Sequence, residues 1–559
     1  MKYISKAFLG LLLLIIGSVF LFSSAKEKEE LKSVKAAQRP NIILIMADDM
    51  GYSDISCFGS EIPTPNLDKL ASKGVRFSQF YNGARCCPTR ASLMTGLFPH
   101  QAGIGQMSEE PSDTAFYHWG TQGYQGYLNR NCVTLAEVLG SAGYHTYMSG
   151  KWHLGMHGEE KWPLQRGFEK YYGILAGATS YLKPQGGRGL WYMNTKLPAP
   201  QSNYYTTDAF TDSAIAFVDQ QKDTNPFFLY LAFNAPHWPL QAKEEDIKKF
   251  EGKYLKGWDK IREERYARQL KSGIVTADTK LSTRDSAVRA WDKLSPAEQK
   301  DVAHRMAVYA AQVSCIDDNV GKLISYLQKK GQLDNTLIVF LSDNGACPEP
   351  YKELGGGKME DINNADSSSA ISYGMGWANA SNTPYRKWKR ETEEGGISAP
   401  FIMYWPKGID KKEENTIVRT PSYLLDIMPT FAEVAKAKYP SEYKGNAIYP
   451  LSGRSLAPVF LGDTLSQPQY MFWEHEGNQA VRKGNWKAVK SNKMNAWELF
   501  DLFTDRAEEH NLASRYPDVL NDLTTKWTEW SQKDFVFPKH KDPNDKRVAM
   551  NSVTNRRQY

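Results

Sequence analysis

The sequence predicts an α/β fold with a mostly parallel sheet, followed by a smaller C-terminal α+β subdomain with an antiparallel sheet. Short, continuous apolar runs recur along the chain, and such runs are typical of strands that are buried on both faces. Amphipathic stretches of helical pattern separate these runs. Polar residues that can bind a ligand directly follow four of the runs, at the edge where open parallel sheets place their sites.

The beginning of the chain predicts a targeting segment. Residues 1–25 combine two early lysines, an apolar run and a Ser-Ser-Ala end, which is the pattern of a secretory signal peptide. The run is short for a membrane span, so cleavage is favoured over an uncleaved anchor. Residues 26–39 are highly charged and predict a flexible leader. We therefore expect an exported protein with no stable membrane anchor.

The predicted strands belong to one large catalytic domain over residues 40–450. The clearest helical segments between them cover residues 135–139 and about 320–328. The apolar runs that predict strands cover residues 41–47, 144–150, 227–234, 336–342 and 401–406.

Two other regions differ in composition. Residues 241–305 are rich in charged side chains of helical pattern, which predicts a helical insertion on the surface; a solvated face is favoured over a basic arm that binds a partner. After a stretch rich in Pro, Gly and Ser near 440–470, short alternating segments and a helical segment at 514–532 follow. They predict a C-terminal subdomain over residues 451–559.

The overall composition excludes some classes of function. The formal net charge of +6 is small for 559 residues, and the basic residues do not cluster, which argues against a nucleic-acid partner. The six cysteines are too few and too scattered for a disulfide framework, and their spacing is not that of zinc ligands. Whether any of them pair as disulfides stays open at this point.

The polar residues at the four strand ends are of two chemical kinds. One group carries hard oxygen atoms, which suit calcium or magnesium rather than zinc or copper. The other group carries cations or proton donors, and cations beside a metal imply an anionic substrate. Taken singly, such residues are more often structural, for example in a turn or a helix cap, but four strand ends together favour a site. The oxygen group is Asp48, Asp49, Asp343 and Asn344, and the second group is Lys151, His153, His237 and lysines near 389.

The stretch RCCPTRASLMTG, residues 85–96, predicts a short helix at this site. Pro88 suits the first helical position, with Cys87 as the N-cap and Gly96 as the stop. A helix N-terminus attracts anions and lowers the pKa of a thiol. From the residues alone, Cys86 remains a disulfide partner, a thiol nucleophile or a residue that is modified in the finished protein.

The same stretch resembles the C-x-P-x-R signature of the formylglycine-dependent (type I) sulfatases of the alkaline phosphatase superfamily. The segments NIILIMADDMGYSD, SGKWHLG, NAPHWP, LSDNG and NTPYRKWKRETEEGGISAPFIMYWP also resemble that family and follow its order. The resemblance extends from residue 40 to about 515 and is closest to bacterial arylsulfatases. Serine or threonine is more usual in place of Cys87, but Pro88 and Arg90 fix the register on Cys86.

The resemblance implies a fold, a modified residue and a metal. The fold is a large mixed, mostly parallel sheet sandwiched by helices. Cys86 would be oxidised to formylglycine by a formylglycine-generating enzyme or an anaerobic maturase. One calcium ion would be bound by Asp48, Asp49, Asp343, Asn344 and the modified residue 86.

The resemblance also implies catalytic and substrate-binding roles. Arg90 and Lys151 would hold the hydrated aldehyde and the sulfate oxygens, and His153 would lie against the aldehyde hydrate. His237 and Lys389 would contact the sulfate near the leaving oxygen. Lys389 is preferred to Lys387 because it lies six residues before Gly395.

The implied reaction is hydrolysis of a sulfate ester to an alcohol or phenol and inorganic sulfate. One hydroxyl of the aldehyde hydrate attacks sulfur, and His237, with Lys389, supplies the proton for the leaving group. The second hydroxyl then loses its proton to His153, which reforms the aldehyde and expels sulfate.

The natural substrate is the least determined feature of the sequence. A sulfated carbohydrate, such as an algal polysaccharide or a glycosaminoglycan fragment, is favoured for an enzyme exported to a bacterial periplasm or beyond. The alternatives are a small aryl sulfate, a phosphoester hydrolase of the same superfamily, or an inactive protein that binds sulfated glycans. Residues 118–131 and 180–194 are rich in aromatic residues and glycine, and predict either a wall for sugars or ordinary packing loops.

Overall fold

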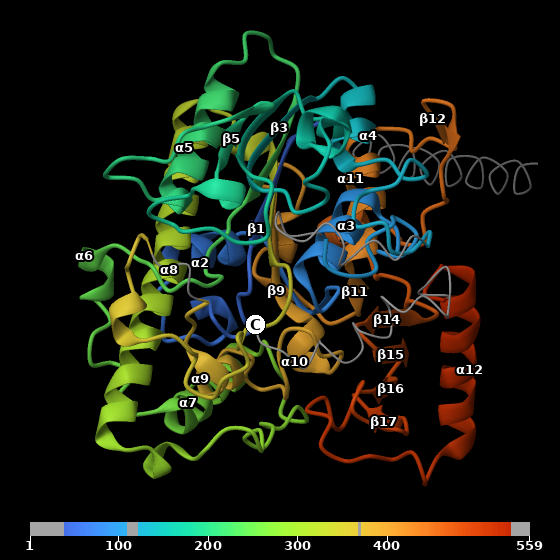
Figure 1. Ribbon diagram of the computed structural model, residues 1–559. Helices are drawn as coiled ribbons and strands as arrows, with labels where there is room; N and C mark the ends of the chain where they lie inside the picture. The colour runs from blue at the N-terminus through green and yellow to red at the C-terminus, as the bar shows by residue number, and fades with distance from the viewer. Residues whose placement is uncertain (1–38, 109–120, 367–369, 538–559) are drawn as a thin grey trace, which may run out of the picture.

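The computed structural model of the protein describes residues 39–108, 121–366 and 370–537 (Figure 1). The predicted signal peptide, and all of the predicted leader except Arg39, lie outside the described residues. Within the described ranges, no helix is both long enough and apolar enough to cross a membrane.

An eleven-stranded sheet forms the centre of the molecule, with the strand order β10-β2-β9-β8-β1-β7-β3-β4-β5-β6 and with β11 beside β2. The four strands β8, β1, β7 and β3 are adjacent and parallel. The strands are β1 (Asn41–Ala47), β2 (Val75–Tyr81), β3 (His145–Lys151), β4 (Lys170–Ile174), β5 (Leu190–Tyr192), β6 (Thr195–Lys196), β7 (Phe227–Ala232), β8 (Thr336–Ser342), β9 (Ser398–Tyr404), β10 (Thr416–Val418) and β11 (Ser422–Tyr423).

The sheet is mixed, because β9 runs antiparallel to both β8 and β2, and β5 runs antiparallel to β4. All five apolar runs of the sequence form strands of this sheet. The structure therefore confirms the predicted fold class.

Helices cover both faces of the sheet. Ile42 and Leu44 of β1 pack into a core with α3, α4 and α11, whereas Ile43 and Ile45 pack into a second core with α2, α5 and α8. Figure 1 shows these two helical layers on opposite sides of the sheet. The helices are α2 (Pro65–Ser72), α3 (Cys86–Thr95), α4 (Leu135–Ser141), α5 (Thr206–Asp219), α6 (Glu244–Ile247), α7 (Trp258–Ser272), α8 (Pro296–Lys329), α9 (Gly374–Ser381), α10 (Glu394–Ile397), α11 (Ile427–Ala435) and α12 (Pro517–Lys533).

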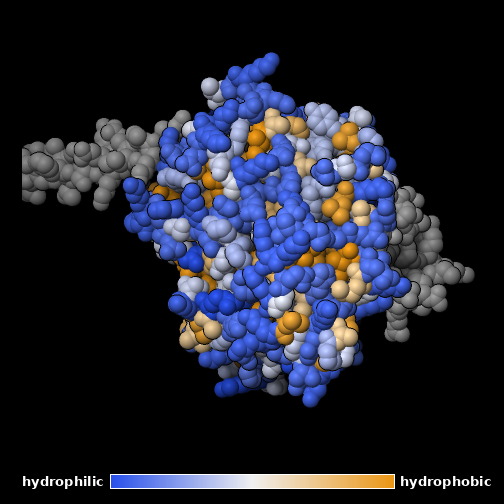
Figure 2. All heavy atoms as spheres, turned by 90° about the vertical axis from the view of Figure 1, so that its left-hand side faces the viewer, coloured by the Kyte–Doolittle hydropathy of each residue, from blue (hydrophilic) through white to orange (hydrophobic). Residues whose placement is uncertain are grey.

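The charged segment 241–305 contains α6, α7 and the first turns of α8. Its outer side is charged, and Figure 2 shows that the face of the molecule nearest α5, α6 and α8 is mainly hydrophilic. Its inner side is buried: Trp258 and Ile261 lie in the second core, and the Arg265 guanidinium pairs with Asp54 at 2.6 Å and with Glu61 at 2.8 Å. The segment is thus anchored to the loop that follows β1.

The C-terminal part forms a separate antiparallel sheet covered by α12 (Figure 1). Buried charges join this sheet to α10: Lys487 contacts Glu394 at 3.0 Å and Glu508 at 2.9 Å, and Arg506 contacts Glu394 at 2.8 Å. The subdomain boundary at residue 450 stays a prediction. The strands of this sheet are β14 (Met471–His475), β15 (Asn478–Lys483), β16 (Trp486–Lys490) and β17 (Glu498–Asp501), and a separate pair is β12 (Glu442–Tyr443) and β13 (Asn446–Ala447).

Candidate active site

The four adjacent parallel strands end at one edge of the sheet, and the polar residues identified in the sequence follow them there. Asp48 and Asp49 follow β1, His237 lies in the loop after β7, and Lys151 ends β3. Asp343 and Asn344 follow β8. In the sheet, β8 is separated from β3 only by β1 and β7. Residues far apart in the sequence are therefore neighbours in the fold.

One half of this cluster is built around Asp48. Lys151 Nζ lies 2.6 Å from one carboxylate oxygen of Asp48, and Arg90 lies 3.5 Å from the other. The same guanidinium contacts Asp343 at 3.0 Å. All four side chains are fully buried, so these charges interact in a low dielectric and depend on one another for compensation.

The other half is built around Asp49. Lys389 Nζ lies 2.9 Å from one of its carboxylate oxygens, and His237 Nε2 lies 3.3 Å from the other. Lys387, the alternative considered in the sequence, instead pairs with Asp285 of the 241–305 segment at 2.6 Å. The geometry thus brings Lys389 into the cluster and leaves Lys387 outside it.

The oxygen atoms of the cluster fit a hard cation. Asn344 donates a hydrogen bond to Asp49 at 2.6 Å, while its own amide oxygen is buried without a hydrogen-bond partner among the described residues. Burial and the neighbouring charge of Asp48 raise the pKa of Asp343 well above its ordinary value. Three buried carboxylates and an unpartnered amide oxygen form an all-oxygen donor set of the type that calcium prefers.

The helix that carries Cys86 begins earlier than its sequence predicts. Helix α3 starts at Cys86 with Arg85 as its N-cap, so the assignment of Cys87 as the cap was wrong. Pro88 is the third helical residue, where its missing N–H is one that the first turn leaves unpaired in any case. Gly96 ends the helix with a φ of 70°, as predicted.

The two cysteines at this helix start face a sulfur and a histidine. Cys87 Sγ lies 3.1 Å from His153 Nε2, and Cys86 Sγ lies 3.8 Å from Met107 Sδ. The Cys86 and His153 donor atoms are also within 4.8 Å of each other. The hydrogen bond from Cys87 and the nearby Lys151 charge lower the pKa of the Cys86 thiol well below its usual range, although burial opposes them. The six cysteines, all among the described residues, form no disulfide.

Two site residues have a strained backbone. Asp49 has a φ of 70° and His153 a φ of 56°, in the left-handed region that non-glycine residues seldom adopt. Such conformations persist only where the surrounding structure holds them, and they concentrate at functional sites. Both residues lie just beyond a strand end, where the chain turns sharply around the cluster.

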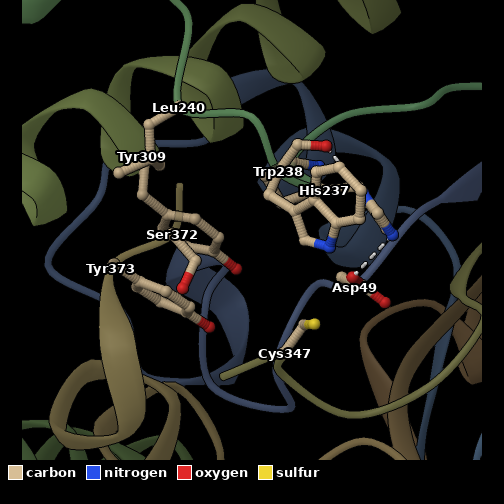
Figure 3. A pocket seen from close by; sticks show the side chains of 9 residues that line it. Asp49, His237, Trp238, Leu240, Tyr309, Cys347, Ser372 and Tyr373 are labelled. Atoms are coloured by element: carbon tan, nitrogen blue, oxygen red, sulfur yellow. Dashed lines mark hydrogen bonds and ion pairs between the residues drawn. The ribbon is translucent and has the colours of Figure 1, made fainter. Parts of the chain in front are cut away.

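The protonation of His237 follows from its contacts. Its Nδ1 lies 2.7 Å from the carbonyl oxygen of Trp238, which can only accept, so Nδ1 carries a proton. Burial lowers the pKa of His237 to about 4, with Lys389 adding to the effect and Asp49 opposing it. Figure 3 shows His237 turned toward Asp49 beside a small pocket. The pocket is lined by Asp49, Pro236, His237, Trp238, Leu240, Tyr309, Cys347, Ser372 and Tyr373.

Sequence reasoning missed a buried carboxylate beside the cluster. Glu349 pairs with Arg85 at 2.6 Å, accepts from the Trp238 indole at 3.1 Å and lies 3.6 Å from Lys389. Arg85 and Lys389 hold the pKa of Glu349 well below its ordinary value against the effect of burial. Glu349 lies in the loop after β8. Its position shortly after Asp343 in the sequence is the one feature that could have identified it as a site residue.

The fold and this site together define a hydrolase of the alkaline phosphatase type. The family model described as "Sulfatase" matches residues 40–437, which is most of the chain, and a model described as "N-sulphoglucosamine sulphohydrolase, C-terminal" matches residues 387–533. The chain therefore belongs to the sulfatase family and is a sulfuric ester hydrolase.

Individual relatives agree with this assignment. The chain is 36% identical to the arylsulfatase of Klebsiella aerogenes over 76% of this chain and 92% of that protein. It is 35% identical to an uncharacterized sulfatase of Schizosaccharomyces pombe over 88% and 93% of the two chains. The solved structure of Ps i-CgsB in complex with k-i-k-neocarrahexaose is 29% identical, covers 92% of this chain and 98% of that chain, and superposes with a TM-score of 0.66.

Proposed function

We propose that this sulfatase hydrolyses its ester with a formylglycine made from Cys86 and with one calcium ion. The observation that carries the proposal is the position of Cys86 at the start of α3, where its thiol interacts electrostatically with Asp49 of the buried oxygen cluster and with the cations Arg90 and Lys151. Catalysis by an unmodified thiol would not require the buried carboxylate and amide oxygen atoms. A calcium ion beside a modified residue 86 gives a role to the groups around both Asp48 and Asp49.

The cation would be held by the oxygen atoms of the cluster together with residue 86. When bound, calcium supplies positive charge that polarises the sulfate and stabilises charge developing in the transition state. The same charge would offset the mutual repulsion of the buried carboxylates. The proposed ligands are Asp48, Asp49, Asp343, Asn344 and the modified residue 86.

The basic side chains are proposed to bind the sulfate and to move protons. Arg90 and Lys151 are fixed by buried carboxylates, so they offer charge to the sulfate and to residue 86 without reorganisation. His153, within 4.8 Å of position 86, is suited to accept a proton from that residue.

His237 and Lys389 are proposed to serve the leaving group. Because Nδ1 of His237 is committed to a backbone carbonyl, Nε2 is the nitrogen available to the substrate. An anionic sulfate beside Nε2 favours the protonated imidazole, so substrate binding itself would prepare His237 to donate. Lys389 Nζ, 3.4 Å from Nε2, can replace that proton.

We further propose a sulfated oligosaccharide as the natural substrate. The structural relative Ps i-CgsB was solved in complex with an oligosaccharide, k-i-k-neocarrahexaose. In this chain the half-buried Trp238 lies beside His237, and the Arg188 guanidinium lies 5.6 Å from the centre of its ring. An indole with a cation over it suits a sugar ring that carries negative charge. Residues 180–194 would then supply part of the sugar wall.

Mass spectrometry of the peptide that contains positions 86 and 87 tests the modification. Protein made in a host that matures sulfatases is expected to carry an aldehyde or its hydrate at position 86 and an intact cysteine at position 87. An active preparation with both cysteines unmodified would overturn the proposal. The maturing enzyme, formylglycine-generating or anaerobic, and a periplasmic or secreted location belong to the same proposal.

Replacing Trp238 by alanine tests the substrate class. We expect kcat/KM for a sulfated oligosaccharide to fall about tenfold or more, because truncating a tryptophan at a binding hot spot costs about 2 kcal/mol or more, while a small aryl sulfate is affected less. Equal losses on both substrates would favour the alternative, a small aryl sulfate as the natural substrate. Trp486, which is also half-buried but packs against Tyr516 in the C-terminal part of the chain, provides the matched control.

A further inference from the structure

Four soft donor atoms surround the start of α3. They are the thiols of Cys86 and Cys87, the thioether of Met107 and the imidazole of His153, which we call the thiol cage. Met107 Sδ lies 3.8 Å from Cys86 Sγ and 3.7 Å from Cys87 Sγ, and His153 Nε2 lies 3.1 Å from Cys87 Sγ. The two thiols and the imidazole nitrogen all lie within 4.8 Å of one another.

These separations are those expected around a single metal ion. Bonds of about 2.3 Å from a tetrahedral metal to sulfur place neighbouring sulfur atoms about 3.8 Å apart. Both thiol–thioether separations match this value, and the two thiols and the imidazole nitrogen lie within 4.8 Å of one another, close enough for one ion to reach all of them. The hydrogen bond of 3.1 Å between Cys87 Sγ and His153 Nε2 would lengthen to about 3.5 Å when both atoms bind the metal. Cys86, Cys87 and His153 are almost completely buried, so their donor atoms are already held in place.

The chemistry of the thiol cage differs from that of the oxygen cluster beside it. Thiolate, thioether and imidazole ligands select soft ions such as Cu(I) and Zn(II), whereas calcium takes oxygen. A thioether is a characteristic ligand of copper and not of structural zinc. Because Met107 contacts both thiols, the set favours Cu(I).

We propose that the chain with an unmodified Cys86 binds one Cu(I) ion in the thiol cage. The site exists only before maturation, because conversion of Cys86 to formylglycine removes one of its thiolates. Because the cage forms only in the folded chain, the site is a property of molecules that folded before Cys86 was modified. This property is additional to sulfate ester hydrolysis, and its test uses no activity assay.

The test uses the full chain made without a maturing enzyme, with an unmodified Cys86 verified by mass spectrometry. Cu(I) is added without oxygen against a chromogenic Cu(I) chelator, and the bound equivalents and affinity are measured. We expect one tightly bound equivalent, weakened about 100-fold by Cys87→Ser and about 10-fold or more by Met107→Leu. Cys132→Ser is the control, because this buried thiol lies near Arg166, outside the cage, and should leave binding unchanged.

Two further measurements make the outcome decisive. X-ray absorption of the wild-type copper complex should show both sulfur and nitrogen neighbours, which requires no variant to fold. Titration with Zn(II) should show weaker binding that Met107→Leu does not change. Failure to bind one equivalent of Cu(I), or binding that Cys87→Ser leaves intact, would overturn the thiol cage; Zn(II) binding more tightly than Cu(I) would overturn the choice of copper.

Discussion

Two lysines of the segment before α10 lie two positions apart and have different surroundings. Lys389 is buried against Asp49, and Lys387 pairs with Asp285 of the 241–305 segment. We expect Lys389→Ala to lower kcat/KM for an aryl sulfate by about 10²–10³, as loss of one preorganised donor does at comparable sites.

The matched control is Lys387→Ala, measured with the same substrate and at the same calcium concentration. It should retain nearly full kcat/KM, because its partner Asp285 lies outside the cluster. A larger loss for Lys387→Ala than for Lys389→Ala would reverse the assignment of the two residues.

His237 allows a test that separates proton donation from simple binding. If its Nε2 protonates the leaving oxygen, His237→Ala should slow esters of alcohols far more than esters of acidic phenols, which leave without a proton. The measurement is the dependence of log kcat/KM on the pKa of the leaving group, and we expect a steeper negative slope for the variant. Parallel lines for wild type and variant would instead assign His237 to binding alone.

The site residues that follow strand ends could be predicted from the sequence, but the residues that pack beside them could not. Asp48, Asp343 and His237 could be identified because each follows an apolar run. Glu349 lies further along the loop after β8, and Met107 follows no apolar run; their closeness to the site depends on loop paths that no periodicity encodes. Lys389 was reached through a family resemblance rather than through a physical pattern.

Among the elements, the buried strands were the most predictable. Their continuous apolar runs have the length of strands rather than of helices, and β1 and β8 have the predicted bounds. The start of α3 was placed two residues late because Pro88 was taken as the first helical residue. Strand β2, VRFSQFY, was not recognised, since polar residues interrupt its apolar pattern.

Helix α7 gives a prediction about stability. Arg265 is fully buried between Asp54 and Glu61. Arg265→Ala removes the only ion pair that buried Asp54 makes among the described residues, whereas the partly exposed Glu61 keeps its contact with Arg268. We expect the free energy of unfolding in urea to fall by about 3–5 kcal/mol. Lys260→Ala on the same helix removes an exposed pair with Glu263 and should cost less than about 1 kcal/mol.

The Arg265 variant should also affect the active site indirectly. Asp54 accepts a hydrogen bond from the Gly51 amide at 2.8 Å, and Gly51 lies two residues after Asp49. A destabilised variant whose calcium affinity is unchanged would show that the 241–305 segment supports only the fold. A weaker affinity would show that it also shapes the metal site.

For the whole molecule, calcium is expected to stabilise the fold. The ion would bind only the folded state, because its proposed ligands come from separate strands; at 100 times its Kd it contributes about 2.7 kcal/mol. Thermal unfolding with calcium or with a chelator measures the effect. Asp343→Asn should abolish most of the shift, and magnesium should replace calcium poorly because it demands a tighter octahedral geometry. An unchanged melting temperature would argue against the metal assignment.

The fold class could be predicted from the sequence, but the arrangement of the sheet could not. Alternation of apolar runs and helical segments is typical of a parallel sheet, which describes β8, β1, β7 and β3. Strand β9 pairs antiparallel with β8, at one edge of this parallel group. That outcome is decided by the packing of the whole domain and leaves no local signal.

The Asp49 amide donates a hydrogen bond of 3.0 Å to Asp343, which lies 294 residues later in the sequence. This contact can form only after the chain has been made as far as residue 343. Cys86 retains only 1% of its exposure once the fold is complete, and every residue of α3 is buried. On the proposed conversion of Cys86, the modifying enzyme would have to reach this side chain before the strand around residue 340 pairs with the first strand. If Cys86 is converted as proposed, the rate at which the newly made chain closes its sheet would limit how many molecules are converted, and a slower-folding variant would leave more time for the reaction.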